Sequence, residues 1–571
     1  MQRHRTTIAV LLAASLALAG TVLPATAADP HPAPVAPAAD PVVLPVDPAE
    51  PVEIGLVLRG RDPEGLTAFL AAVADPDAPE YRAYLTPETY AERFGLPADA
   101  HAALIAELAA AGLEVVRSVP QRTSLSVRGS AAHVSAFLGT PLEALTDPLT
   151  GLRHLAAPTE VAVPVAIADR VLTITGLERR LPRAAIDPDD APPLPGRGLK
   201  PVDLARAYGF AELRAAGIDG TGSTVAILQY GVDTDEDLAV FDATFGIEAP
   251  PPERIGIAGG LADAPDDFAG EATLDTQVVR AAAPGARIIV YGFPSTFSMA
   301  LAVDEIVSRG EAEIISISYG KCFLPGEYIS DAEVAAGQAL FATAAALGVN
   351  VFVASGDTGA YTCHMFDPED HRPTPAWPSC ADNVISVGGT FLETREDGTR
   401  FRETGWQDYL VTAGGGGGVN PVDPRPAWQR APGVENERST GMRQCPDVAA
   451  AADPDTGYHV FFTDPETGEA GWQMIGGTSA AAPLWAAMAA LISQVAREEG
   501  RGLGGVPGRL GFLPPELYRI ARETPEAFYD VTRGGNLLDA AGEGWDYATG
   551  LGTPNLATLA AAIVAALPEA P

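Results

Sequence analysis

GGTSAAAPLWAAMAALISQV, residues 476–495, joins a glycine-bounded serine to a long apolar run. The apolar run has helical periodicity, so we expect Ser479 at the N-terminus of a helix. Pro483 should fall in the first turn of that helix, where its missing N–H costs little. A serine in this position gains from the helix dipole, and nearby backbone N–H groups can face a developing oxyanion. Ser479 is therefore a candidate nucleophile, although a serine that only caps the helix has the same setting.

The run EATLD, far upstream, contains two carboxylates, Glu271 and Asp275, spaced four residues apart. On a helix they share one face, where two like charges repel each other and one pKa rises. A solvated helix face has the same spacing, but the surrounding AGEATLDTQVV is mostly apolar, which argues against it. The pair is therefore a candidate for acid–base chemistry.

None of the eight histidines lies in a setting such as HGTH, which a subtilisin-type hydrolase would need. Five fall in the N-terminal region: His4, His31, His101, His133 and His154. The other three are His364, His371 and His459. A serine hydroxyl is a poor nucleophile without a base. A carboxylate base, with a reference pKa of about 4.3, stays ionised at pH 4, where an imidazole of pKa about 6.5 is protonated. A serine nucleophile whose proton is taken by a carboxylate instead of an imidazole therefore indicates hydrolysis in acid.

A third carboxylate, Asp357, follows the buried strand predicted over residues 350–355 in NVFVASGDTGA. In parallel sheets, sites gather at the carboxyl ends of the strands. A lone aspartate in a glycine-flanked turn is usually only a turn former. If Asp357 faces the oxyanion, it must be protonated to donate a hydrogen bond, which again selects low pH.

The first 27 residues have the features of a secretory signal. Arg3 and Arg5 precede an apolar run over residues 8–20, and Ala25-Thr26-Ala27 is an A-x-A cleavage site. The apolar run is too short to span a membrane, as is the C-terminal LATLAAAIVAAL. We therefore expect a secreted, extracellular protein without a membrane anchor.

The composition is that of a globular protein with more than one domain. The chain has 571 residues, of which 19% are charged and 47% hydrophobic. The net charge of −37 argues against nucleic acid or an anionic membrane as partner. An ordinary acidic secreted protein has the same charge, so the charge alone does not indicate activity in acid.

The pattern along the chain divides it into three parts after the signal. Residues 28–182 comprise a Pro/Ala-rich leader and a compact α+β unit. Residues 183–198 contain RAAIDPDDAPPLPGRG, a proline-rich linker that is a natural cleavage site between compact units. Residues 199–571 alternate short β-branched runs with helical segments, which predicts a parallel sheet covered by helices on both faces.

These motifs resemble those of the sedolisins, the serine-carboxyl peptidases, and are most similar to the kumamolisin-like members. The strings EATLD, ASGDTG, PDVAAAADPDTGY, GGTSAAAPLWAA, FYDVTRGGN and GWDYATGLGTPN occur in family order. DAPEYRAYLTPETYAERFG resembles a stretch of sedolisin prodomains. The resemblance implies an α/β fold: a subtilisin-like parallel sheet flanked by helices, preceded by an α+β, ferredoxin-like prodomain that acts as an intramolecular inhibitor.

The resemblance also assigns roles at the site. It implies Ser479 as nucleophile, Glu271 as general base, Asp275 as its supporting acid and Asp357 in the oxyanion hole. The string G-T-S-x-x-x-P, as the nucleophile motif of this fold and its acid relatives, favours a nucleophile over a simple cap.

The chain departs from its relatives in two places near these residues. Gln229 in VAILQYG and Tyr319 in SISYG stand where some relatives extend the acid network with a glutamate and a tryptophan. We therefore expect a less extreme pH optimum. Five glycines at residues 414–418 replace a shorter Gly-Gly-Gly-x-Ser run, so a binding loop is expected to differ.

A calcium site is implied near the C-terminus by FYDVTRGGN and AGEGWDYATG. By resemblance, Asp530 and Asp546 supply side-chain oxygens, while Val531, Gly542 and Gly544 supply carbonyl oxygens. Calcium prefers oxygen ligands on flexible backbone of this kind. The Gly-x-Gly-x-Asp string alone is equally typical of a plain turn, and the distant Asp-Val strengthens the metal interpretation.

Four cysteines in an exported chain favour two disulfides, and three pairings are possible. By similarity to some fungal relatives we favour Cys363–Cys380, which leaves Cys322–Cys445. The chain has no C-x-x-C, so a zinc site is not expected.

The resulting hypothesis is a secreted, monomeric acid endopeptidase, made as a zymogen, that acts on proteins or peptides. One alternative is a neutral subtilisin-type serine peptidase that uses His364 or His459. Another is a catalytically inactive, calcium-bound secreted binding protein. Side-chain preference, and endopeptidase against tripeptidyl-peptidase action, stay open at this point.

Overall fold

The computed structural model describes residues 42–147, 151–184, 198–261, 268–465 and 467–570. The predicted signal sequence, residues 1–27, lies outside the described residues, as does most of the linker predicted over residues 183–198.

The N-terminal part is built on a four-stranded antiparallel sheet with the strand order β3-β4-β2-β7. Its strands are β2 (Pro51–Leu58), β3 (Glu114–Ser118), β4 (Ser124–Ser130) and β7 (Val171–Thr175). Its helices are α1 (Pro63–Ala74), α2 (Pro87–Arg93), α3 (Ala98–Ala110) and α4 (Ala131–Leu138). A smaller sheet has the order β1-β5-β6, with β1 (Val42–Leu44), β5 (Glu143–Thr146) and β6 (Arg153–Ala156). This α+β unit has the strand order of a ferredoxin-like fold, as expected.

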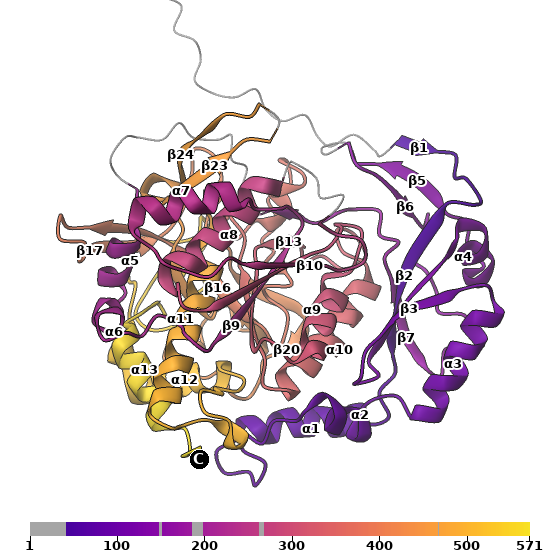
Figure 1. The fold of residues 1–571 in the computed structure, drawn as a ribbon, viewed down its shortest axis with the longest axis horizontal. Helices are drawn as coiled ribbons and strands as arrows, with labels where there is room; N and C mark the ends of the chain where they lie inside the picture. The colour runs from indigo at the N-terminus through magenta and orange to yellow at the C-terminus, as the bar shows by residue number, and fades with distance from the viewer. Residues whose placement is uncertain (1–41, 148–150, 185–197, 262–267, 466, 571) are drawn as a thin grey trace, which may run out of the picture. The chain divides into compact units, whose positions relative to one another are not determined.

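The C-terminal part is built on an eight-stranded sheet (Figure 1). Along the sheet the order is β10-β11-β9-β12-β14-β16-β17, and β22 also pairs with β16. All neighbours are parallel except β16 and β17. The strands are β9 (Thr224–Gln229), β10 (Glu253–Gly256), β11 (Arg287–Gly292), β12 (Ile314–Ile317), β14 (Asn350–Ala354), β16 (Ile385–Thr394), β17 (Arg400–Gly405) and β22 (Val448–Ala451).

Helices cover both faces of this sheet, because successive strand residues point to opposite sides. On β9, Val225 and Ile227 pack in one buried cluster with α8 (Ala269–Ala282), α11 (Thr478–Glu498) and α13 (Leu556–Ala565). Ala226 and Leu228 pack in a second cluster with α9 (Met299–Arg309) and α10 (Asp331–Ala346). The predicted subtilisin-like parallel sheet flanked by helices is confirmed.

Short strands and helices complete this part. The shorter strands are β8 (Arg183–Ala184), β13 (Tyr319–Cys322), β15 (Ala376–Trp377), β18 (Gln407–Asp408), β19 (Ala413–Gly414), β20 (Gly418–Pro424), β21 (Met442–Cys445), β23 (Tyr458–Thr463), β24 (Ala470–Ile475), β25 (Phe528–Tyr529) and β26 (Thr553–Pro554). The remaining α-helices are α5 (Pro201–Ala207), α6 (Ala211–Ala215), α7 (Asp235–Phe245) and α12 (Pro514–Glu523).

Helix α11 is the central helix of the C-terminal part. Among the described residues it is the one helix long and apolar enough to cross a membrane, and 94% of its most apolar 18-residue window is buried in the protein. It begins at Thr478, so Pro483 lies inside the helix and the prediction that this proline falls in the first turn is wrong. Because proline has no N–H, the carbonyl of Ser479 lacks its usual helical partner and is free for another donor.

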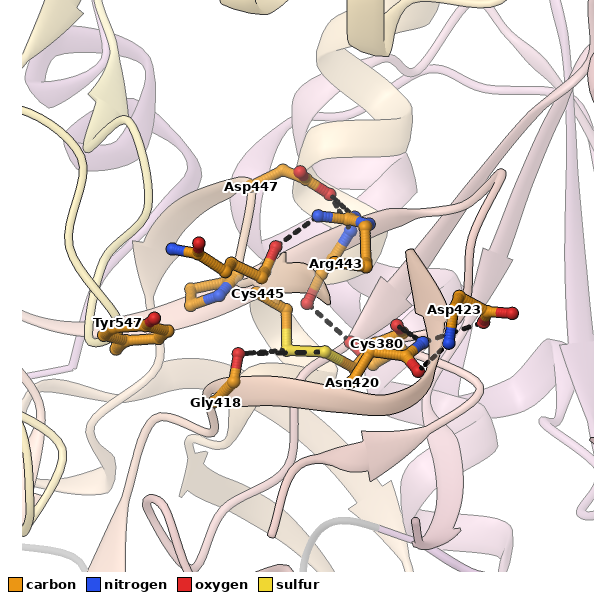
Figure 2. The surroundings of a disulfide bond; sticks show 12 residues. Cys380, Gly418, Asn420, Asp423, Arg443, Cys445, Asp447 and Tyr547 are labelled. Atoms are coloured by element: carbon orange, nitrogen blue, oxygen red, sulfur yellow. Dashed lines mark hydrogen bonds and ion pairs between the residues drawn. A yellow bond between two sulfur atoms is a disulfide. The ribbon is translucent and has the colours of Figure 1, made fainter. Parts of the chain in front are cut away.

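The two disulfides join Cys322 to Cys363 and Cys380 to Cys445, so the predicted pairing is wrong. Cys322 ends β13, which packs against the 3₁₀ helix Thr362–Met365 that carries Cys363. The sulfur atoms of Cys380 and Cys445 lie 4.0 and 3.5 Å from the Gly418 carbonyl oxygen (Figure 2). Two cysteines that flank one loop in sequence thus face different neighbours in space.

Candidate active site

Ser479 is the second residue of α11 and is fully buried. The helix is capped by Gly477, which has a φ of 98°, and no side chain caps it. A role for Ser479 as a simple cap is therefore excluded by its position. Its Oγ donates a hydrogen bond of 3.4 Å to the carbonyl oxygen of Ser318.

Ser318 links the nucleophile to the acid pair, and the sequence interpretation did not single it out. It lies between β12 and β13 and is fully buried. Its hydroxyl donates to Asp275 Oδ1 at 2.7 Å and lies 3.3 Å from the carbonyl oxygen of Ser479, the carbonyl that Pro483 leaves free. The only sequence signal was its place in SISYG, next to Tyr319.

Glu271 and Asp275 lie in the first half of α8, and both are buried, so this face of the helix is not solvated. Burial raises the pKa of Glu271 well above its usual range, and the charge of Asp275 raises it further. The hydroxyl of Ser479 is close enough to lower the pKa of Glu271 in part. Burial likewise raises the pKa of Asp275 well above normal. The two carboxyl groups therefore resist ionising together.

The carboxylate oxygens of Glu271 have no hydrogen-bond partner among the described residues, and neither has Asp275 Oδ2. Glu271 is therefore a buried base with free lone pairs beside a serine hydroxyl. Catalytic hydrogen bonds are often long before substrate binds, so the orientation of Ser479 toward Ser318 does not conflict with proton transfer to Glu271.

Gln229 and Tyr319 border the acid pair, as the resemblance implied. Gln229 ends β9, is fully buried, and donates to the carbonyl oxygen of Ala272 at 2.9 Å. Its side chain also lowers the pKa of Asp275. Tyr319 is buried, and its pKa is raised well above normal by burial and by the charges of Glu271 and Asp275. Both neighbours are uncharged at acid and neutral pH, so neither adds a carboxylate to the pair.

Asp357 follows β14 in a glycine-flanked turn and is buried. Its Oδ1 accepts hydrogen bonds from the backbone N–H of Thr478 at 2.8 Å and from the Thr478 hydroxyl at 2.7 Å. Burial raises the pKa of Asp357 to about 7. Below that pH the group carries a proton and can donate it in a hydrogen bond. Thr478, which anchors Asp357 to the start of α11, was not singled out from the sequence, although it stands in GTS.

The two histidines proposed for a neutral peptidase have other neighbours. His364 stacks on His371 with ring centres 4.9 Å apart, and His459 packs edge-on against Trp472 at 6.3 Å. Within the part of the chain that the structure describes, the charged neighbours that raise the pKa of Glu271 are Asp275 and Asp357. The hydrogen bond of the Ser479 hydroxyl goes to the Ser318 carbonyl oxygen and not to a histidine.

The glycine run 414–418 packs directly against the turn of Asp357. The N–H of Gly414 donates to the carbonyl oxygen of Asp357 at 2.8 Å, and the N–H of Gly416 donates to that of Gly356 at 2.8 Å. A Cβ on Gly416 would overlap the carbonyl of Ser355. This close approach of two backbones requires glycine.

The backbone of β8 pairs with β13, the strand that follows Ser318. The pairing is antiparallel, with Ala184 opposite Tyr319 and Arg183 opposite Gly320. Extended peptides bind exposed sheet edges in this way. The last described residues before the linker therefore occupy a strand-binding edge next to the nucleophile.

The proposed calcium ligands lie in one loop. Asp530 Oδ2 accepts from the N–H of Gly544, and Asp546 Oδ2 accepts from the N–H of Gly542, both at 2.9 Å. Burial raises the pKa of Asp530, and raises that of Asp546 to about 6. Neither forms an ion pair with a basic residue among residues 42–570 as far as these are described. Asp530 is exposed and Asp546 is buried, and two carboxylates without a basic partner on a glycine-rich loop fit a hard cation with oxygen ligands.

The described residues contain no group of three or more His, Cys, Asp or Glu side chains that could hold a metal ion. A cation at this loop therefore depends on backbone carbonyl oxygens, which is the donor set expected for Val531, Gly542 and Gly544.

Both parts of the chain are similar to known protein families. Residues 42–180 match the family described as "Pro-kumamolisin, activation domain", and residues 257–502 match the subtilase family. Kumamolisin from Bacillus sp. (strain MN-32) is 33% identical over 532 residues, which cover 88% of this chain and 90% of that protein. Sedolisin from Pseudomonas sp. (strain 101) is 28% identical over 541 residues, covering 90% of this chain and 87% of that protein.

A mammalian protein and a solved structure show the same relationship. Tripeptidyl-peptidase 1 from Homo sapiens is 28% identical over 556 residues, covering 89% of this chain and 91% of that protein. The structure of Pseudomonas sedolisin, a serine-carboxyl proteinase complexed with two molecules of pseudo-iodotyrostatin, aligns with a TM-score of 0.56 and 28% identity. It covers 65% of this chain and 99% of that one.

Proposed function

Because this chain belongs to the sedolisin family of serine-carboxyl peptidases, we propose that it cleaves peptide bonds in acid through Ser479, Glu271 and Asp275. The observation that carries the proposal is the buried acid pair beside the nucleophile, joined to it by Ser318. The chain is a serine-type peptidase with a prodomain. The proposal adds that it works in acid, with a carboxylate as the base.

The mechanism follows from the positions of these groups. The Oγ of Ser479 attacks the scissile carbonyl while Glu271 takes its proton. The Ser318 hydroxyl donates a hydrogen bond to Asp275 and holds it in place. Asp275 lies beside Glu271 and stabilises its protonated form. The protonated Asp357 and the N–H of Ser479 donate hydrogen bonds to the oxyanion. Glu271 then returns its proton to the leaving amine, and water hydrolyses the acyl-enzyme.

The pKa of Asp357 sets the upper limit of the active range. With a pKa of about 7, its carboxyl is protonated throughout the acid range and loses its proton as the pH rises through 7. An ionised carboxylate facing the oxyanion would repel it. The neutral peptidase alternative requires the opposite dependence, since an imidazole base loses its function when it is protonated.

A peptide-library digestion by the matured enzyme between pH 3 and pH 7, read by mass spectrometry, tests the proposal. Internal cleavage at pH 4 supports an acid endopeptidase, whereas release of tripeptides from free N-termini identifies tripeptidyl-peptidase action. Absence of cleavage below pH 5 together with cleavage at pH 7 would reject the acid mechanism. Absence of cleavage at every pH favours the inactive binding protein.

The prodomain contacts α9 of the C-terminal part, as an intramolecular inhibitor would. Asp304, fully buried, accepts hydrogen bonds from Gln121 at 2.9 Å, Thr123 at 2.7 Å and Ser124 at 2.6 Å. Burial raises the pKa of Asp304. The charged form is therefore penalised at neutral pH, and the penalty disappears as the pH falls through the raised pKa. The three hydrogen bonds from the prodomain lower this pKa and so oppose the effect of burial.

Maturation is expected to place the new N-terminus between residues 185 and 199. The reason is that the linker is proline-rich and that β8, the last described strand before residue 198, pairs with β13, the strand that follows Ser318. N-terminal sequencing after a shift from pH 7 to pH 4 measures the cleaved bond. A mature N-terminus before residue 150, or an active enzyme that keeps its full chain, would show that residues 28–182 are not a removable inhibitor.

Calcium removal is expected to lower the melting temperature by several degrees and to leave the catalytic groups unchanged. A ligand present at about 100 times its Kd stabilises the native state by about 2.7 kcal/mol. Differential scanning calorimetry with and without a chelator measures the change. Asp530→Asn should abolish the response to chelator, and Glu543→Gln, an exposed change within the same loop, should preserve it. An unchanged melting temperature for calcium-free wild type would count against the site.

We propose further that the first 27 residues direct export and that the enzyme works outside the cell as a monomer. The prediction rests on the signal-like sequence and the predicted pair of disulfides, whose count agrees with the two that the structure forms.

A further inference from the structure

A site with an aromatic face and an acidic rim lies at the far end of the strand-binding edge. Tyr328 is buried against Phe366, with ring centres 5.8 Å apart, in a cluster that includes the Cys322–Cys363 disulfide. The Tyr328 hydroxyl donates to Asp370 Oδ2 at 3.2 Å. Glu327 adjoins it in sequence. We refer to Glu327, Tyr328 and Asp370 as the Tyr328 site.

The zymogen fills this site with a basic side chain of its own. The guanidinium carbon of Arg180, in the last turn of the prodomain chain, lies 4.8 Å from the centre of the Tyr328 ring. Burial raises the pKa of Tyr328 and the hydrogen bonds of Arg372 lower that of Glu327, and the charge of Arg180 acts on both groups, so Arg180 lies near the acidic rim as well as the ring. A guanidinium over a tyrosine face is a cation–π contact.

The rim keeps its negative charge in acid. Arg372 bonds to Glu327 at 2.6 and 2.9 Å and to Asp370 at 3.0 Å, so one cation faces two carboxylates. Asp367 adds a further negative charge near Tyr328. The hydrogen bonds of Arg372 lower the pKa of Glu327 and hold that of Asp370 at about 2. Asp370 therefore stays ionised at pH 4 and can still attract a basic side chain.

The strand pairing places this site upstream of the cleaved bond. Ala184 stands opposite Tyr319 on β13, and Arg180 precedes Ala184 by four residues. The Cys322–Cys363 bond ties the other end of β13 to the cluster of Tyr328. After the prodomain leaves, a substrate that pairs with β13 in the same direction as β8 takes the place of the prodomain tail. One of its residues before the cleaved bond then lies where Arg180 lies in the zymogen.

We propose that the matured enzyme uses the Tyr328 site to bind an arginine or lysine of its substrate, four residues before the residue that pairs with Tyr319. This inference rests on the proposed peptidase function and adds a preference for substrates with a basic residue well before the scissile bond. Arg180 is the internal counterpart of that residue, released when the prodomain leaves.

Kinetics of the matured enzyme on a peptide series at pH 4 test the inference. A reference decapeptide without basic residues is compared with peptides that carry one arginine, or its neutral isostere citrulline, at each upstream position in turn. One distal position should raise kcat/KM about fivefold for arginine over citrulline, mainly through KM, as expected for a partly exposed cation–π contact. The nearer positions should show no such response.

Four variants separate binding from structure. Tyr328→Leu should remove the preference, whereas Tyr328→Phe keeps the ring and should retain it. Glu327→Gln should reduce the preference, and Glu369→Gln, an exposed change on the same loop as Asp370, should leave it intact. For each variant, the quantity compared is the ratio of kcat/KM for the arginine peptide to that for its citrulline counterpart, and Glu369→Gln should also cleave the reference peptide at the wild-type rate.

The outcomes distinguish this inference from the function beneath it. Cleavage of the reference peptide with equal rates for arginine and citrulline at every position would overturn the Tyr328 site and leave the peptidase standing. A preference that survives Tyr328→Leu would also overturn it. Failure to cleave any peptide in acid would instead reject the proposed function.

Discussion

Replacing Ser479 by alanine is expected to abolish peptidase activity and to leave the precursor at full length. Ser479 lies in the first turn of α11 with the buried carboxyl group of Glu271 beside it, whereas the neighbouring Thr478 hydroxyl is held by Asp357. Alanine retains the helix but has no oxygen to form an acyl-enzyme. Loss of a nucleophile commonly lowers the rate by about 10⁴- to 10⁶-fold.

The measurement is turnover of a fluorogenic peptide at pH 4, with electrophoresis of the precursor before and after acidification. Ser493→Ala is the matched control. Ser493 is a buried serine of the same helix, whose hydroxyl donates to the Gly508 carbonyl oxygen at 2.8 Å. Its loss should cost some stability and leave turnover unchanged. Normal processing and activity of pure Ser479→Ala protein would end the assignment of the nucleophile.

Replacing Glu271 by glutamine is expected to lower kcat by about 10²- to 10⁴-fold, the usual cost of losing a general base. Glutamine has the shape of glutamate but cannot accept the proton of Ser479. It also removes one of two repelling buried carboxyl groups, so the free energy of unfolding should not decrease. Loss of activity without loss of stability is the signature of a catalytic carboxylate.

Kinetics and denaturant unfolding of the matured variant between pH 3 and pH 6 test both parts. Glu403→Gln serves as a control, because Glu403 is a buried glutamate of β17 that pairs with Arg400, accepts a hydrogen bond from Tyr208 and has no contact with Ser479 among the described residues. That control should lose stability and keep its turnover. Wild-type kinetics of Glu271→Gln over this range would mean that the base lies elsewhere.

Much of the fold could be predicted because its signals are local. Alternation of short β-branched runs with helical segments identified the parallel sheet, and the apolar run after Ser479 identified α11. The strand β3 gives only a weak signal, because its residues EVVRS are mostly half-exposed and lack a regular alternation. The prediction that Pro483 lies in the first turn was wrong because the helix already begins at Thr478 and includes Ser479. Pro483 therefore lies further inside the helix.

The contacts between distant segments could not be predicted in the same way. Ser318 and Thr478 carry no signal of their own, and each matters because folding brings it to a carboxylate on another element. The prediction of the disulfide pairing was wrong for a similar reason. Cys363 and Cys380 border one loop in sequence, but Cys363 packs beside β13 and Cys380 beside Gly418.

The dependence of kcat/KM on pH, measured from pH 2 to pH 9 on a peptide without ionisable side chains, tests the central claim most directly. A serine served by the buried acid pair, with a protonated Asp357 of pKa about 7 at the oxyanion, predicts high activity at pH 4 and a decline as the pH rises through 7. A profile that is inactive at pH 4 and rises with an apparent pKa near that of an imidazole, about 6.5, would contradict it.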